Sequence, residues 1–373
     1  MADYVIIGGG VYGVATAWRL AEAGASVVVL ERKGVATGAS GGPGRRGVRA
    51  NWRDRRELPL MAAAYPVWEG LHDVLGVEGL FERTGNLKLI GRERDLPLAR
   101  AQAWMQTQAG VETHVLDAAQ VREMEPHAEP GILGGVLCPL DGVSDHTKTT
   151  HAYAAAAKRA GAEIREGAEA SGLVYAGDRA VGVRLSSGET VEAGTGVLVL
   201  SNWSVADLMA DRAEIPTWNA AFQVLLSRPL ADVPSPRVIG HASRTLSLKA
   251  EPGGRVMISG GYRGAYDLET HIGVAIQSEI DANVADAVAT FPMLKGIEID
   301  VADAGHLESV CVDQVPVIDQ PAGCRNVWYA TGWCGHGWAI APVVADLIAQ
   351  YVTDGKRPAL LEPFKLDRFG ATA

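Results

Sequence analysis

The sequence predicts an α/β fold with two interleaved domains, one on a largely parallel sheet and the other, an α+β domain, on a large and mostly antiparallel sheet. Three observations support this prediction. A strand, a glycine turn, a helix and a second strand follow one another within residues 4–31. Strand-like alternation runs through residues 215–310, and another strand, turn and helix occupy residues 327–352. Since no Pro/Ser-rich linker separates these regions, we expect the domains to be interleaved.

The N-terminal unit has the pattern of a dinucleotide-binding site. Residues 4–7 form a short apolar run typical of a buried strand, and Gly8, Gly10 and Gly13 follow in the spacing GxGxxG. Gly8 permits a tight turn, Gly10 lets the backbone approach a pyrophosphate, and Gly13 lets the helix pack closely on the strand. The phosphates would then lie at the positive N-terminus of the helix.

An acidic residue at the end of the second strand narrows the choice of dinucleotide. Residues 27–30 form that strand and Glu31 follows it, at the distance from the glycines where an acid accepts hydrogen bonds from a ribose diol. A carboxylate there would repel a 2′-phosphate, which disfavours NADP. FAD and NAD remain as alternatives at this point.

The middle of the chain alternates between helical and strand-like patterns. A capped helix start lies in residues 117–126. Helical periodicity predicts helices at residues 59–75, 97–109, 151–160 and 277–290. Apolar and alternating runs predict strands at residues 85–90, 133–138, 173–175, 181–185 and 197–200, with a further one at Ile164.

The C-terminal unit brings a second helix N-terminus toward a ligand. Residues 327–330 form a strand, a glycine turn follows, and Pro342 is expected in the first turn of the next helix, where its missing N–H has no cost. A helix dipole would stabilise the negative charge that collects on a reduced flavin, so this element favours FAD over NAD. The alternative is a C-terminal docking helix entered by a glycine-rich turn.

Composition excludes several other classes of protein. The chain has 373 residues, 47% of them hydrophobic, and a net charge of −10, which argues against nucleic acid as a partner. No apolar run approaches the roughly 20 residues that span a bilayer, and the first strand begins too near Met1 to leave room for a signal peptide. The four cysteines, Cys138, Cys311, Cys324 and Cys334, lack metal-ligand spacing, which predicts a reduced cytoplasm and no metal site.

Three segments together resemble a known family. The glycine fingerprint, ATGASGGPGRRGVR and TGWCGHGWAIAP are similar to the D-amino acid oxidase (DAO) type of FAD-dependent oxidoreductase, which includes glycine oxidase, monomeric sarcosine oxidase and the sarcosine oxidase β subunit. The resemblance implies a Rossmann-like FAD-binding domain at 1–84, 140–214 and 325–373, interleaved with an α+β substrate domain at 85–139 and 215–324.

The activity implied by the resemblance is oxidation of the C–N bond of a small amine or amino acid. Sarcosine or another N-methyl amino acid, glycine or a D-amino acid would pass a hydride to flavin N5, and the resulting imine would hydrolyse. O2 or another electron acceptor would reoxidise the flavin. The alternatives are an FAD-carrying subunit of a multi-subunit amine dehydrogenase, in an oligomer or with a partner subunit, and an NAD-dependent dehydrogenase.

The resemblance also assigns residues to the site. Arg49 would hold a substrate carboxylate, His336 would approach the flavin from the GHG turn, and Arg263 is the next candidate for the carboxylate; these three form the predicted catalytic set. The predicted FAD-binding residues are Gly8, Gly10, Val11, Tyr12, Gly13, Glu31, Arg32, Ser40, Arg46, Val174, Gly332, Gly335, His336, Gly337 and Trp338. Trp333 and Trp338 either wall the substrate cavity or simply pack.

Departures from the family pattern leave the flavin linkage, the electron acceptor and the carboxylate-binding residue undecided. His306 is the nearest match to the cysteine that links the flavin in monomeric sarcosine oxidases, so a histidyl link is an alternative to the dissociable, non-covalent FAD that we expect. The lysine that promotes reaction with oxygen falls near Met257, which leaves oxidase and dehydrogenase both open. A second carboxylate-binding lysine falls at Ala339, so Arg49, Arg263 or Lys249 would have to hold a carboxylate.

Two further departures and one basic stretch affect the substrate prediction. Cys311 replaces a usual hydroxyl, and Glu308 stands where an arginine is common, so no substrate rule can be inherited from the family. The arginines at positions 53, 55 and 56 are as consistent with a solvated basic loop as with a role in the site.

Overall fold

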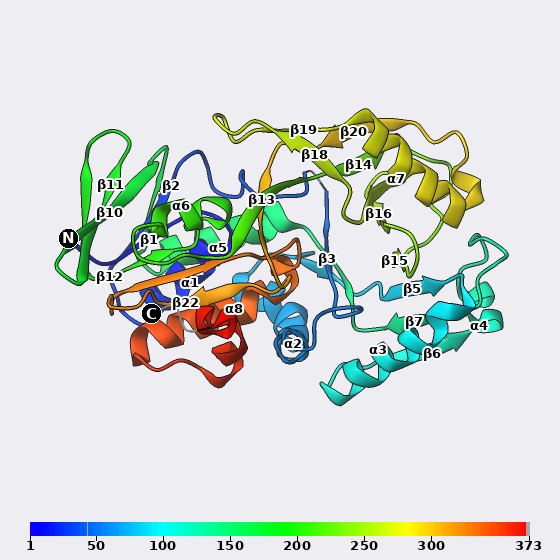
Figure 1. Cartoon of the computed structure of the whole chain (residues 1–373), viewed down its shortest axis with the longest axis horizontal. Helices are drawn as coiled ribbons and strands as arrows, with labels where there is room; N and C mark the ends of the chain where they lie inside the picture. Colours follow the sequence, from blue (N-terminus) through cyan, green and yellow to red (C-terminus); the bar gives the residue numbers. More distant parts are fainter. Residues whose placement is uncertain (43, 371–373) are drawn as a thin grey trace.

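Two eight-stranded sheets lie at opposite ends of an elongated molecule (Figure 1). The structure is a computed structural model that describes residues 1–42 and 44–370. The core of the first sheet is parallel, in the order β9, β2, β1, β12, β23, with bounds Glu163–Glu166, Val27–Glu31, Ala2–Ile7, Thr190–Val199 and Val327–Thr331. Three antiparallel strands complete it: β10 (Ala170–Ala176), β11 (Arg179–Leu185) and β22 (Val317–Asp319).

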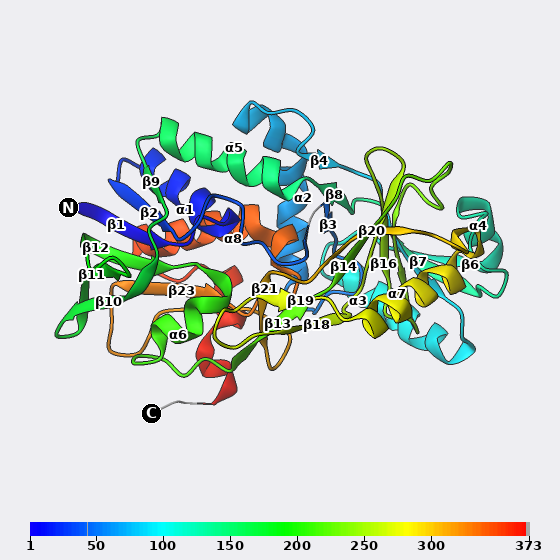
Figure 2. The ribbon, with the colours of Figure 1, turned by 90° about the horizontal axis from the view of Figure 1, so that it is seen from above.

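Helices from distant parts of the chain cover one face of this first sheet. They are α1 (Val11–Glu22), α5 (His146–Arg159) and α8 (Gly337–Asp354), with α2 (Leu58–Leu75) packed on α8. Figure 2 shows α1, α5 and α8 side by side above the strands. The first and last long helices of the chain therefore share one core.

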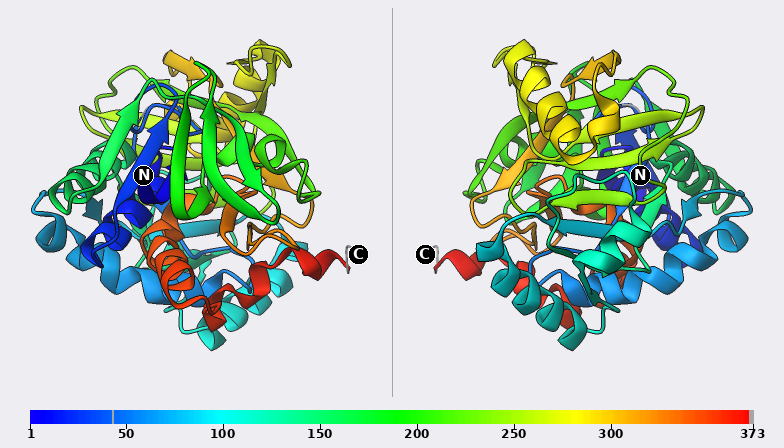
Figure 3. Two further views of the ribbon diagram at one scale, coloured as in Figure 1. Left: turned by 90° about the vertical axis from the view of Figure 1, so that its left-hand side faces the viewer. Right: turned by 90° about the vertical axis from the view of Figure 1, so that its right-hand side faces the viewer.

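The second sheet has the order β20, β14, β17, β16, β15, β5, β7, β6, and all its pairs are antiparallel except β15 with β5. The bounds are Ile299–Asp303, Val224–Ser227, Arg255–Ser259, Ser247–Glu251, Val238–His241, Asn86–Ile90, Gly134–Cys138 and His114–Asp117. On one face, side chains such as Leu248 and Ile258 form an apolar core with α7 (Gln277–Thr290). The right panel of Figure 3 shows α7 as a yellow helix. The helices α3 (Leu96–Gln108) and α4 (Ala118–Met124) lie near β6 and β7.

Two small sheets join the large ones. One contains β19, β18, β13 and β21 (Gly273–Val274, Arg263–Tyr266, Thr217–Phe222, Leu307–Cys311), and the other contains β3, β8 and β4 (Arg46–Val48, Gly142–Ser144, Phe81–Glu82). A short helix, α6 (Val205–Met209), follows β12. The predicted fold class is confirmed, whereas the domain boundaries stay a prediction; β22 pairs with β23 of the first sheet although it precedes residue 325.

Most predicted elements form, but two helices begin earlier than expected. Helix α5 starts at His146, because the Asp145 side chain accepts a hydrogen bond from the Lys148 N–H at 2.9 Å and caps it. Helix α8 starts at Gly337, so the prediction that Pro342 lies in its first turn is wrong. Gly335, with a φ of +73°, turns the chain into the helix before the proline is reached.

No helix among the described residues combines the length and apolar character needed to cross a bilayer.

The segment that connects β3 to α2 is held by one buried carboxylate. Asp141 accepts hydrogen bonds from the Ala50 N–H at 2.7 Å, the Asn51 N–H at 3.2 Å and the Tyr65 hydroxyl at 2.7 Å. Burial raises its pKa to about 6, against the lowering effect of these donors. Asp141 therefore fixes the backbone directly after Arg49.

Replacing Asp141 with alanine should lower the free energy of unfolding by about 3 kcal/mol, because it leaves buried donors without a partner. The matched variant Tyr65→Phe removes only one donor and should cost about 1 kcal/mol. Urea titration followed by circular dichroism measures both values. Equal losses in the two variants would contradict the anchoring role of the carboxylate.

Candidate functional site

A cavity of about 570 Å³ runs from the N-terminus of α1 to the turn before α8. Its wall also includes the end of β2, the loop after it, the start of β10 and the α6 region. The predicted FAD-binding residues that line it are Gly8, Gly10, Val11, Tyr12, Glu31, Arg32, Ser40, Arg46, Gly335, Gly337 and Trp338. Residues from both ends of the sequence thus meet in one cavity.

The three glycines of the fingerprint occupy different environments. Gly8 has a φ of +112°, and its N–H donates to the Leu30 carbonyl at 2.8 Å. A Cβ on Gly13 would overlap the Gly8 carbonyl oxygen, so this position needs glycine for the helix to approach the turn. A Cβ on Gly10 would meet no protein atom within 4 Å, which leaves open space at the start of α1.

Glu31 holds the glycine turn against the end of β2. Its Oε2 accepts a hydrogen bond from the Gly9 N–H at 2.8 Å, and its Oε1 accepts one from the Lys33 N–H at 2.9 Å. An ionised carboxylate oxygen can accept more than one hydrogen bond. Glu31 can therefore also receive the hydroxyls of a ribose from the cavity that it lines.

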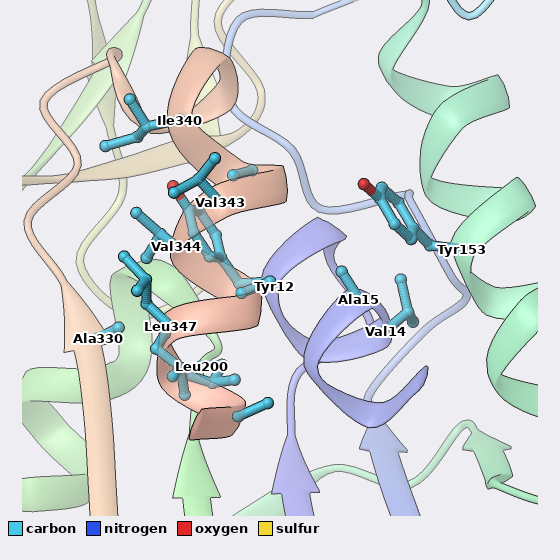
Figure 4. Close-up of a cluster of buried hydrophobic side chains, with 14 of the residues drawn as sticks. Tyr12, Val14, Ala15, Tyr153, Leu200, Ala330, Ile340, Val343, Val344 and Leu347 are labelled. Atoms are coloured by element: carbon cyan, nitrogen blue, oxygen red, sulfur yellow. The ribbon is translucent and has the colours of Figure 1, made fainter. Parts of the chain in front are cut away.

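Tyr12 connects the two helix N-termini directly. Its hydroxyl donates to the Gly337 carbonyl at 2.5 Å, and its ring stacks on Trp333 with centroids 3.8 Å apart. Figure 4 shows Tyr12 reaching from α1 toward α8, close to Val343 and Val344. A Cβ on Gly337 would press into the Trp333 ring, so glycine is required there for this packing.

Glu308 joins three segments of the cavity wall. It is buried and accepts hydrogen bonds from the Ser40 hydroxyl, from Asn202 Nδ2 at 3.1 Å and from the Gly335 N–H at 2.8 Å. Burial raises its pKa, while the donors and Arg46 act in the opposite direction. The acid found where the family commonly has arginine thus ties the loop after β2 to the turn before α8.

Arg46 supplies a half-buried positive charge at the cavity. Its guanidinium donates to the carbonyls of Gly44 at 3.2 Å and Ser40 at 3.1 Å, and also to that of Gly42. Burial lowers its pKa to about 10, with Glu251 and Asp303 opposing this effect. The side chain consequently stays protonated at neutral pH.

Arg49 and His336 lie outside the wall of this cavity and belong to a neighbouring buried cluster. Arg53 donates to Glu57 Oε1 at 2.9 Å and to the His336 carbonyl at 3.0 Å, and His336 Nδ1 lies 3.9 Å from Glu57 Oε2. Burial, followed by the charges of Arg49 and Arg53, lowers the pKa of His336 well below its usual value, so the imidazole is neutral.

The remaining predicted residues lie apart from the cavity wall. Arg263 is exposed on β18, with its guanidinium 5.8 Å from the Phe222 ring centre. Gly332 has a φ of +74° and packs against Cys311 and Thr217. Val174 lies within β10, whereas the residues before and at the start of that strand, 168–171, line the cavity. His306 Nδ1 lies 3.7 Å from Asp303, and its predicted lack of a flavin link stays a prediction.

Sequence reasoning missed several residues of the site. The cavity is also lined by Asn202, Trp203 and Asp207 from the α6 region and by residues 269–271, which carry no motif. Arg53 is buried in an ion pair rather than solvated. The spacing of Arg53 and Glu57, four residues apart directly before a predicted helix, could have indicated that pair.

Comparison with known proteins now identifies the family. The model of the FAD dependent oxidoreductase (DAO) family matches residues 3–351. The chain belongs to this family. The predicted relationship is confirmed, as is FAD rather than NAD as the cofactor.

Individual relatives extend over nearly the whole chain. The sarcosine oxidase subunit beta of Arthrobacter sp. is 26% identical over 98% of this chain and 91% of its own length. The same subunit from Rhizobium meliloti (strain 1021) is 27% identical over 98% of this chain and 88% of its own length.

Solved structures share the fold at lower identity. L-proline dehydrogenase from P. horikoshii has a TM-score of 0.89 and 23% identity, covering 99% of this chain and 97% of its own. Glycine oxidase from Geobacillus kaustophilus has a TM-score of 0.84 and 22% identity, covering 98% of both chains.

The cavity has the properties that FAD requires. The open space at Gly10 admits a pyrophosphate at the N–H groups of α1. In the wall at the other end, Trp338 Nε1 is buried with no hydrogen-bond partner among the residues that the structure describes, and an acceptor on the ligand would satisfy it. The residues present therefore fit the cofactor.

The contrast between Gly10 and Gly13 gives a direct test of this fit. Gly10→Ala should leave the stability of the apoprotein nearly unchanged but weaken FAD binding by about tenfold or more, because the methyl group fills the space for the pyrophosphate. Gly13→Ala should instead destabilise the apoprotein by about 3 kcal/mol through overpacking. Thermal denaturation and titration with FAD measure these effects. Wild-type FAD affinity in Gly10→Ala would place the pyrophosphate elsewhere.

Proposed function

We propose that the protein oxidises the C–N bond of a small amine or amino acid with non-covalently bound FAD. The single observation that carries this proposal is the convergence of two helix N-termini and the half-buried Arg46 on one cavity in a member of the FAD dependent oxidoreductase family. Bound FAD would take a hydride from the carbon next to the amine nitrogen. The nitrogen would also lose a proton, and water would convert the imine to a carbonyl compound and an amine.

Charge stabilisation is the main contribution expected from the chain itself. The N-terminus of α1 would bind the pyrophosphate, while the N-terminus of α8 and the Arg46 guanidinium would stabilise negative charge at the ring. Glu31 would hold the ribose. Only a neutral amine has the lone pair needed for the reaction, and a buried cation beside the substrate disfavours the ammonium form.

The names of relatives support the choice of substrate class. They include sarcosine oxidase subunits, glycine oxidase and L-proline dehydrogenase. Because two of these relatives are beta subunits, we also propose that the chain can work with a partner subunit. A cytoplasmic location is proposed because all four cysteines are free and buried. The oxidant that restores the flavin can be O2 or another electron acceptor. Met257 stands near the position of the lysine that promotes reaction with oxygen in the family, and it carries no charge.

Absorption spectroscopy tests this proposal. The purified protein should be yellow, and acid precipitation should release its flavin into the supernatant. Anaerobic mixing with N-methyl amino acids, glycine, proline and D-amino acids should bleach the flavin band with at least one of them. The C–N assignment is wrong if only a hydroxy acid bleaches it. A colourless protein that takes up no FAD would contradict the proposal as a whole.

A further inference from the structure

The second sheet has one apolar face, and its opposite face, which we call the basic face, carries Lys88 and Lys249 beside apolar side chains such as Val136. Register pairs Lys88 with Gly240, Gly240 with Ser247, and Lys249 with Met257, so Lys88 and Lys249 lie on the same face. Leu248 and its neighbours on the opposite face pack under α7. The basic face is turned toward the chain around residues 44–52: the Arg45 N–H donates to Glu251, and Lys88 Nζ lies 5.4 Å from the Trp52 ring centre.

Lys249 is buried and Lys88 is half-buried on this face, and Glu251 is the acid that acts electrostatically on Lys249. Lys249 is 5% exposed. Gly240 has no side chain, and Lys88 leans over it, with Nζ only 3.5 Å from the place of a Cβ. The Lys88 ammonium contacts the Trp52 ring, and no hydrogen bond or salt bridge is found for either ammonium group within the described ranges 1–42 and 44–370. A buried lysine without an anion is costly, so an anionic occupant is expected.

Arg49 adds a third positive charge to this cluster. Its Nη1 donates to the Asn51 carbonyl at 2.9 Å, and it forms no ion pair with the described residues. The pKa of Lys88 falls to about 8 through burial and then through the charge of Arg49. The pKa of Lys249 also falls to about 8, through burial and the nearby arginines at positions 45, 46 and 49, with Glu251 opposing. Geometry also places Arg49 beside the strand of Lys88, because Asn51 Nδ2 donates to the carbonyls of Asn86 at 3.2 Å and of Val136 at 2.8 Å, and Val136 pairs with Lys88.

The nearby acids are already engaged. Asp141 accepts hydrogen bonds from Ala50, Asn51 and Tyr65, and Glu251 accepts the Arg45 N–H at 2.9 and 3.1 Å. One carboxylate, bound to Arg49 by a guanidinium fork, would leave Lys88 without a compensating acid and Lys249 with only the shared charge of Glu251. The cluster matches an anion with two negative groups.

We propose that the substrate is an amino acid with a second carboxylate, in which Arg49 holds the carboxylate next to the amine and Lys88 and Lys249 hold the distal one. This inference rests on the proposed function and specifies its substrate class. The three residues bind the carboxylates of the substrate and position it. They take no part in the electron transfer, so the oxidation of the C–N bond is the one described under the proposed function.

Binding of acids that cannot be oxidised tests the inference separately from catalysis. Calorimetry on the FAD-loaded enzyme at pH 7 should give an affinity for glutarate about tenfold or more above that for pentanoate, which has the same chain length and one carboxylate. Lys88→Met and Lys249→Met should each remove most of that preference while leaving pentanoate binding nearly unchanged. Lys249→Arg should retain it, and the exposed Lys356→Met is the control that should match wild type.

Two results would overturn the inference. Equal affinity of the wild-type enzyme for glutarate and pentanoate would show that there is no second carboxylate site, and this result requires no variant to fold. A preference for glutarate over pentanoate that persists in both methionine variants would show that Lys88 and Lys249 do not bind the second carboxylate. Failure of the proposed function is distinguishable, because it appears as a flavin that no amine bleaches.

Discussion

The contact between Tyr12 and the start of α8 is the constraint on which the rest of the site depends. A residue in the first turn of the first helix donates to the carbonyl of Gly337 and stacks on Trp333, more than three hundred positions later in the chain. Both helices lie on the same face of the parallel sheet, and their N-termini open on the same cavity. The positive ends of two dipoles are thereby fixed at one ligand, which has a phosphate end and a ring that gains negative charge.

The contact between the first and last helices also explains where the charged residues Arg46, Arg49, Asp141 and Glu308 lie. The chain leaves the first sheet, forms strands of the second sheet and then returns to the first sheet. The connection through β3 places Arg46 at the cavity and Arg49 outside its wall. Asp141 fixes that connection through its backbone. Glu308 closes the wall on the other side by binding Ser40, Asn202 and Gly335. The buried carboxylates of Asp141 and Glu308 are tolerated because several donors bind each of them.

Local sequence patterns predict much of this arrangement. They do not predict contacts that depend on the pairing of segments distant in the chain. The GxGxxG turn is recognisable because a Cβ on Gly8 or Gly13 would collide with backbone, and Gly337 in the C-terminal turn is needed because a Cβ would press into the Trp333 ring. Pro342 was misplaced because the positive φ of Gly335 lets α8 begin before it. The basic face of Lys88 and Lys249 follows from strand register over distant segments, and no spacing in the sequence encodes that register. The same holds for Asn202 and Glu308, whose partners are distant in the chain.

A crystal structure of the protein with FAD bound would show directly whether the N-termini of α1 and α8 contact one FAD molecule. We expect continuous density for one FAD, with its pyrophosphate at the Gly10 end of α1 and its ring beside Gly335, Trp338 and Arg46. Density that places the ring away from the N-terminus of α8, or the pyrophosphate away from α1, would contradict it.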